Sequence, residues 1–265
     1  NQVGFPLLQV KRNNSTLTLK QSRFLLEDSK NLPNKTWFIP LVIEEGSQRM
    51  KKLMTKKSEK IQLKNKDRNF IINSGRTGFY RIQYDKETLE NLSLLIDEKI
   101  LNYVDRWSLQ NDYFVQTVSG KKSVQEYLDF TSAYYDEDNY ISSLSLGHNL
   151  YSLYIIAHKE KFSDELKEYA VNFLGTVVDR LGWDKKKGET HTDSLLRSFA
   201  IVVLGKLGDN EIISEAELRF KKFLKNPDSL SADLQEAVFS LVAWNGSEST
   251  HKKFVSLYRK ANSQE

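Results

Sequence analysis

The sequence contains no cysteine, and its 265 residues include only 4 prolines and 12 glycines. Without cysteine the chain forms neither disulfides nor a thiolate metal site, so we expect a cytoplasmic protein. The sequence also lacks any apolar run near the ~18 residues that a membrane helix needs, and no targeting leader opens it. Its 39% hydrophobic content, with 14 Phe and 12 Tyr, instead favours packed globular domains without a membrane segment.

Histidine is scarce as well, with 4 residues in the whole chain. None belongs to His-Glu-x-x-His, the helical motif that places two zinc ligands on one face beside a general base. There is no Gly-rich phosphate loop, Gly-x-Ser-x-Gly turn or Ser/His/Asp arrangement either. We therefore predict no catalytic residue and no metal ligand in this chain.

One short segment comes nearest to a ligand cluster. Glu189, His191 and Asp193 are two residues apart, so in an extended segment their side chains would point the same way and could hold a metal or move protons. The same segment also suits a helix start, with Thr190 and Asp193 as a capping box. We prefer the helix start.

The charge of the chain is close to balanced, with a formal net charge of +4. This excess is too small to predict a nucleic-acid partner. Basic residues do crowd the segment from Arg49 to Arg68, where they could steer anions or acidic peptides. We interpret them instead as the solvated edges of antiparallel strands, where lysine prevents edge-to-edge pairing.

The first third of the chain has the pattern of short strands separated by turns. Leu17 and Leu19 alternate with polar residues, which is typical of a sheet buried on one face. The even spacing predicts a small all-β sandwich over residues 1–85. The expected strands are 5–11, 16–20, 36–43, 49–54, 60–63, 69–73 and 79–84.

The stretch Asn73–Asp85 divides this pattern from the next. Gly75 and Gly78 predict a turn, because glycine accepts positive φ without steric cost. A strand follows whose apolar face carries every second residue, namely Tyr80, Ile82 and Tyr84. Asp85 then stands at the N-cap position of the first helix.

Residues 86–265 have helical spacing throughout, so the fold class is mixed and multidomain, with an all-α domain after the sandwich. Short links predict antiparallel helical hairpins stacked as in an α-solenoid. Ser163 is expected to cap one helix and Gly182 to end it. The later helices are expected at 105–119, 123–134, 139–158, 163–181, 191–207, 211–224, 231–243 and 247–261.

The last expected helix has an apolar stripe made of Phe254, Val255, Leu257 and Tyr258. The terminal helix of a solenoid normally needs a polar outer face. We therefore expect the helical domain to be truncated and to continue beyond Glu265.

Several other groups have a structural and a functional interpretation. Asp136, Glu137 and Asp138 could be paired carboxylates, but we interpret them as solvated surface. The aromatic clusters are interpreted as core, with ligand stacking as the alternative. They are Tyr134 with Tyr135, Tyr151 with Tyr154, and Trp107 with Tyr113 and Phe114.

Arg197 lies on an otherwise apolar helix, after Leu195 and before Phe199. A semi-buried arginine needs a carboxylate partner. We expect it to pair with Glu189, and the alternative is direct contact with a bound peptide. These two residues are our candidates for side chains that face a substrate cavity.

Several motifs occur in one order and together resemble the C-terminal half of the M1 family of zinc aminopeptidases. The resemblance extends over essentially the whole chain. The motifs are Gln2-x-Gly4-Phe5-Pro6, Gly78-Phe79-Tyr80-Arg81-Ile82-x-Tyr84-Asp85, Asp105-Arg106-x-x-Leu109-x-x-Asp112, Leu181-Gly182-Trp183, Gly188-Glu189-x-His191, Leu195-Leu196-Arg197 and Asn245-Gly246.

This resemblance implies a β-sandwich and a helical domain that closes over the active site of a longer polypeptide. In the family, zinc is bound by His-Glu-x-x-His with a downstream glutamate, and a Gly-x-Met-Glu-Asn loop holds the substrate amine. Neither motif is present here, so the resemblance implies an inactive chain that shapes the peptide cavity, with zinc in a separate catalytic domain. The implied partners are the catalytic and N-terminal domains of the same polypeptide and the peptide substrate.

The stretch between the sandwich and the helices is then expected to be an interdomain hinge. Its hinge residues are Tyr80, Arg81, Tyr84 and Asp85. A different class of function remains open, since the chain would also suit a self-standing helical module that binds a protein or peptide.

Overall fold

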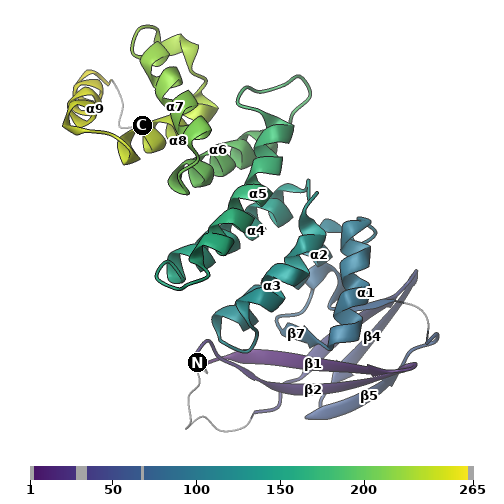
Figure 1. Ribbon diagram of the computed structural model, residues 1–265. Coiled ribbons are helices and arrows are strands. Elements are labelled where there is room, and N and C mark those ends of the chain that lie inside the picture. The colour runs from purple at the N-terminus through teal and green to yellow at the C-terminus, as the bar shows by residue number, and fades with distance from the viewer. Residues whose placement is uncertain (1–2, 28–34, 67–68, 262–265) are drawn as a thin grey trace. The chain divides into compact units, whose positions relative to one another are not determined.

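A computed structural model describes residues 3–27, 35–66 and 69–261 of the chain. The chain forms two compact units, Asn1–Leu146 and Gly147–Glu265, and Figure 1 labels most of their elements. The first unit holds the strands together with the first helices, and the second holds helices. This confirms the mixed fold class. The domain boundary proposed at residues 85 and 86 follows the change from strand to helix and stays a prediction.

Two small sheets make up the start of unit 1, one mixed and one antiparallel. One has the order β5-β2-β1-β7 and the other β4-β3-β6, and β1 pairs antiparallel with β2 and parallel with β7. All seven expected strands are confirmed in order. Their bounds are β1 Phe5–Asn13, β2 Thr16–Phe24, β3 Ile39–Glu45, β4 Gln48–Met54, β5 Ser58–Gln62, β6 Phe70–Ile72 and β7 Arg81–Tyr84.

Alternate residues of the strands form a core between the two sheets. Leu17 and Leu19 of β2 are fully buried, as their alternation with polar residues predicts. Tyr84 of one sheet contacts the other directly: its hydroxyl accepts a hydrogen bond from the backbone N–H of Ile72 at 2.8 Å, and its ring meets that of Phe70. Burial of this apolar surface is the main stabilising term for the sandwich.

The basic segment lies on sheet edges. β4 and β5 are the outer strands of their sheets, and most side chains of β4 are exposed. Lys52 of β4 forms an ion pair with Glu59 of β5. The interpretation of the basic residues as solvated edge residues is confirmed for β4 and β5, and Arg68 lies outside the described residues.

The helices of unit 1 are α1 (Lys86–Asp97), α2 (Tyr103–Val118) and α3 (Val124–Thr131), and α4 (Tyr140–Ile156) begins there. The predicted cap of α1 is confirmed, because Asp85 Oδ1 accepts the Thr88 N–H at 2.9 Å. The other carboxylate oxygen accepts the backbone N–H of Arg12 on β1 at 2.6 Å. One side chain therefore ties the first helix to the first strand.

A capping box begins α3 and supplies a test of pH dependence. Hydrogen bonds from Lys122 and Ser123 lower the pKa of Glu126 from 4.5 to about 2. A lowered pKa in the folded state gives stability that is full above pH 4.5 and is lost as the pH falls through about 2.

We expect Glu126→Gln to flatten the pH dependence of the urea midpoint between these two values. The change should be small, because exposed charges are screened. The matched variant Glu168→Gln, at an exposed position on another helix, should keep the wild-type slope. A wild-type slope in Glu126→Gln would show that the capping box does not carry this pH dependence.

Unit 2 contains the rest of α4 and the helices α5 (Ser163–Leu181), α6 (His191–Lys206), α7 (Asn210–Phe223), α8 (Ala232–Trp244) and α9 (Glu248–Lys260). α5 packs on α6, and α8 packs on both α6 and α7. α5 ends at Gly182 as predicted, but the predicted cap is wrong: Ser163 is the first helical residue and no side chain caps it. The solenoid arrangement stays a prediction.

The end of unit 2 is aromatic. Phe254 of α9 stacks on Phe220 of α7 with ring centroids 4.9 Å apart, and Phe239 of α8 meets both rings edge-on. α9 has no buried residue, and Tyr258 is 75% exposed. Among the described residues, no helix is long and apolar enough to cross a membrane.

Candidate functional site

Two buried aspartates on α2 hold the turn that precedes β7. Asp105 and Asp112 are seven residues apart, so they lie on one face of the helix, two turns from each other. Asp105 Oδ1 accepts the backbone N–H of Gly75 at 2.7 Å. The Ser74 hydroxyl is shared between Glu44 Oε2 at 2.6 Å and Asp105 Oδ2 at 3.3 Å. Burial raises the pKa of Asp105, and the hydrogen bonds from Gly75, Asn102 and Ser74 oppose that rise.

Asp112 binds the far end of the same turn. Its Oδ1 accepts Nη1 of Arg76 at 3.1 Å and Nη1 of Arg81 at 2.8 Å, and its Oδ2 accepts the backbone N–H of Ile82 at 2.9 Å. Gln116, one turn further along α2, donates to the Ile82 carbonyl at 3.0 Å. α2 thus binds both ends of the segment from Ser74 to Ile82.

The turn itself has an unusual backbone. Asn73, Gly75 and Arg76 have φ values of 61°, 70° and 49°, in the left-handed region that L-residues rarely adopt. The Asn73 side chain holds the turn closed, accepting the Gly78 N–H at 2.7 Å and donating to the Gly78 carbonyl at 2.9 Å. A Cβ atom at Gly78 would collide with the ring of Tyr80, so the predicted glycine turn is confirmed with a steric reason.

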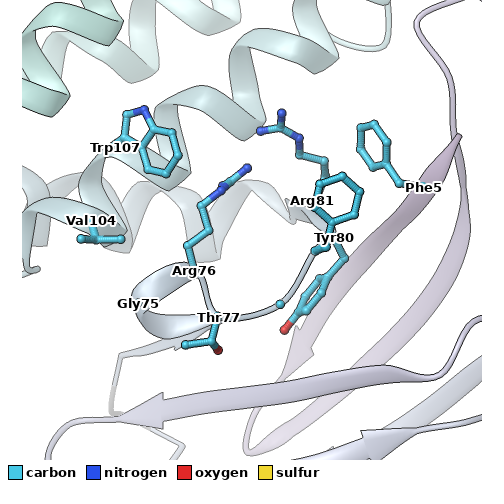
Figure 2. A pocket seen from close by; sticks show the side chains of 10 residues that line it. Phe5, Gly75, Arg76, Thr77, Tyr80, Arg81, Val104 and Trp107 are labelled. Atoms are coloured by element: carbon cyan, nitrogen blue, oxygen red, sulfur yellow. The ribbon is translucent and has the colours of Figure 1, made fainter.

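A cavity of about 560 Å³ opens beside this turn. The Arg76 guanidinium lies 4.8 Å from the ring centroid of Trp107, and the Arg81 guanidinium lies 5.7 Å from the ring centroid of Phe5. In Figure 2 both arginines extend toward the helix that carries Trp107, whereas Tyr80 points toward the strands. The lining residues are Phe5, Gly75, Arg76, Thr77, Gly78, Phe79, Tyr80, Arg81, Val104 and Trp107.

The four predicted hinge residues all lie in this joint between strands and helices. Tyr80 and Tyr84 are buried, and burial raises the pKa of each hydroxyl. Arg81 binds Asp112 and Asn111, and Asp85 caps α1. Their position is fixed by named contacts, and their role as a hinge stays a prediction.

A buried ion pair extends the joint toward α4. Arg106 of α2 makes two hydrogen bonds to Glu137, from Nε to Oε2 at 2.6 Å and from Nη2 to Oε1 at 2.8 Å. Tyr134 donates its hydroxyl to the Arg106 carbonyl at 2.7 Å. The interpretation of the 136–138 carboxylates as solvated is therefore wrong for Glu137, which is 5% exposed. A planar guanidinium on a neighbouring helix offsets the cost of burying that charge.

We expect Glu137→Gln to lower the free energy of unfolding by about 2 kcal/mol, because it removes the charge of a bidentate hydrogen-bonded pair while keeping its shape. Asp136→Asn is the matched control, since the Asp136 side chain is 91% exposed. Urea unfolding of both variants gives the comparison. Equal stability of the two would contradict a structural role for the Arg106–Glu137 pair.

The aromatic clusters are only partly core. Tyr113 and Tyr134 are buried as predicted, but Tyr135 is 63% exposed, so its assignment to the core is wrong. Trp107 is half-buried and lines the cavity. Because the Arg76 guanidinium lies over the Trp107 ring, ligand stacking remains the alternative for this one residue.

In unit 2, Arg197 and Glu189 form the predicted pair. Arg197 is 2% exposed, and its Nη2 binds Glu189, which lowers the pKa of that carboxyl. Arg197 also donates Nε to the Gly182 carbonyl at 2.9 Å and Nη2 to that of Leu181 at 3.3 Å. The arginine therefore closes the carboxyl end of α5. Contact of this pair with a peptide stays a prediction.

The segment that resembled a ligand cluster is a helix start. Thr190 caps α6, with its hydroxyl accepting the Asp193 N–H at 3.3 Å and the Asp193 carboxylate accepting the Thr190 N–H at 2.9 Å. The capping-box interpretation is confirmed.

Comparison with known proteins gives the family of the chain. A sequence profile described as the ERAP1-like C-terminal domain matches residues 69–265, which is more than half of the chain. The chain belongs to this family.

Curated relatives of this ERAP1-like C-terminal domain are aminopeptidases and a related factor. Aminopeptidase M1-A of Oryza sativa subsp. japonica is 28% identical over 97% of this chain and 31% of its own length, and Aminopeptidase M1 of Arabidopsis thaliana is 29% identical over 97% and 32%. Tricorn protease-interacting factor F2 of Thermoplasma volcanium is 29% identical over 86% and 27%. The chain thus spans about a third of the length of these relatives, and it corresponds to the C-terminal part of M1-family aminopeptidases.

The resemblance to the M1 family implies zinc in a separate catalytic domain. Across residues 3–27, 35–66 and 69–261, no three His, Asp or Glu side chains are grouped to hold a metal ion. Glu189 and Asp193 are engaged by Arg197 and Thr190. These residues do not fit zinc, and we assign them no step of peptide hydrolysis.

Proposed function

We infer that this chain is the non-catalytic part of a zinc aminopeptidase that removes N-terminal residues from peptides. Its role is to hold the helical domain on the β-sandwich and to close over and shape the peptide cavity. The observation that carries this proposal is the double attachment of α2 to the turn before β7 by Asp105 and Asp112. Side chains that shape a site keep their geometry when rigid elements and supporting hydrogen bonds hold them, and this attachment supports such a role.

The same proposal names the partners. They are the catalytic and N-terminal domains of the same polypeptide and the peptide substrate, and zinc belongs to the catalytic domain. No His-Glu-x-x-His occurs in the 265 residues, which supports an inactive chain. The absence of cysteine supports a place in the cytoplasm, where thiols stay reduced and disulfides are rare.

Activity and metal content of the purified chain test the proposal. We expect no stoichiometric zinc by elemental analysis and no cleavage of aminoacyl-anilides. Turnover that EDTA abolishes, in a preparation free of other peptidases, would overturn it. A full-length M1 aminopeptidase is the positive control.

A further inference from the structure

The cavity beside the 75–81 turn holds more positive charge than its neighbours neutralise. Arg76 and Arg81 share one acceptor, Oδ1 of Asp112, and both use Nη1 for that bond. Among the residues that the structure describes, the other acceptor of these guanidinium groups is the neutral side chain of Asn111, which binds Arg81. No acidic residue is among the described residues that line the cavity. The two cations therefore share one carboxylate, while Asp105, the other acid of α2 at this turn, is bonded to Gly75 and Ser74.

Both guanidinium groups are held in place by aromatic rings as well as by Asp112. Arg76 lies over Trp107, and Arg81 lies over Phe5. Their side chains are 19% exposed, so they are half-buried but within reach of a ligand. A guanidinium presents five N–H donors in a planar fork that matches a carboxylate, and their Nε and Nη2 groups are not used by Asp112.

Much of the rest of the cavity wall is apolar. Phe5, Val104 and Trp107 line the cavity. Phe79 also lines it and is 87% exposed, and the ring centroids of Phe79 and Phe5 are 5.7 Å apart. A hollow with an apolar wall and a few convergent polar groups is the usual form of a ligand site. Strained backbone at Asn73 and Arg76 fixes the turn that carries the cations, and such strain concentrates at binding sites.

We propose that this pocket binds a carboxylate with a hydrophobic group next to it. The carboxylate receives hydrogen bonds from Arg76 and Arg81, and the hydrophobic group packs against Trp107 and Phe79. The free end of a peptide and the side chain of an aspartate or glutamate in a protein segment both present this chemistry. The proposal names a ligand for this pocket and no reaction, so its test is independent of the proposed function.

Calorimetric titration of the purified chain with three small ligands tests the proposal. N-acetyl-phenylalanine carries a terminal carboxylate, N-acetyl-aspartyl-phenylalaninamide carries a side-chain carboxylate, and N-acetyl-phenylalaninamide carries none. At least one acid should bind about tenfold or more tightly than the amide, because charge-assisted hydrogen bonds are the strong ones. The acid that binds identifies the source of the carboxylate. If both acids bind no better than the amide, the proposal is overturned.

Two variants connect the binding to this pocket. Arg76→Gln should weaken binding of the acid by about tenfold or more, and Phe79→Ser, at an exposed position, should weaken it without a change in melting temperature. Arg219→Gln is the matched control, because Arg219 also lies over a tryptophan, 5.0 Å from the ring centroid of Trp183 in unit 2. Wild-type affinity in both pocket variants, or equal loss in Arg219→Gln, would contradict the assignment.

Discussion

Asp112→Ala is expected to lower the free energy of unfolding of unit 1 by about 3–5 kcal/mol, the usual cost of removing one partner from a buried ion pair. The Asp112 side chain is 7% exposed and accepts three hydrogen bonds. Its removal leaves the Arg76 and Arg81 cations without their shared acceptor and the Ile82 N–H unpaired. These three groups belong to the turn and to β7, so no single rearrangement gives all of them a new hydrogen-bond acceptor.

Urea unfolding followed by circular dichroism measures this loss. Asp97→Ala is the control, because Asp97 is an exposed aspartate at the end of α1, and its change should stay within about 0.5 kcal/mol. If Asp112→Ala unfolds at the same urea concentration as Asp97→Ala, α2 does not hold the turn by this carboxylate.

Arg197→Ala is the second large effect and concerns unit 2. We expect a loss of about 3–5 kcal/mol, because the variant strips the partner from a buried ion pair and leaves a cavity. Two backbone carbonyls at the end of α5, those of Leu181 and Gly182, also lose their donor. Arg197 is the largest of the fully buried side chains, so the packing loss adds to the polar one.

The melting temperature of Arg197→Ala distinguishes its two interpretations. Arg180→Ala, at an exposed position in the last turn of α5, is the control and should melt like the wild type. If Arg197→Ala is placed in the aminopeptidase proposed to contain this chain, changed peptide kinetics at an unchanged melting temperature would instead indicate contact between Arg197 and the substrate. That outcome would contradict a structural role.

The sequence predicts most of the elements because their signals are local. Alternation located the strands, and a cap residue at the right spacing located the start of α1 at Asp85 and of α6 at Thr190. The Arg197–Glu189 pair was also predictable, because a buried arginine needs a nearby carboxylate and Glu189 is eight residues away.

The joint between strands and helices was not predictable in the same way. Asp105 and Asp112 are 30 residues from their partners Gly75 and Ile82, and a helix face that carries two acids is normally solvated. Glu137 was assigned to the surface for the same reason, since its partner Arg106 is 31 residues away. The available signal was the spacing of seven between the two aspartates, which places both on one face of α2.

Native-state hydrogen exchange at the Ile82 amide tests the central claim most directly. If Asp112 makes the turn, β7 and α2 one cooperative structure, this amide exchanges only when unit 1 unfolds, with the same opening free energy as amides in the middle of α2. In Asp112→Asn the opening free energy of the Ile82 amide and that of the α2 amides should then fall together. Exchange of Ile82 by a local opening, with protection far below that of α2 in the wild type, would contradict the account.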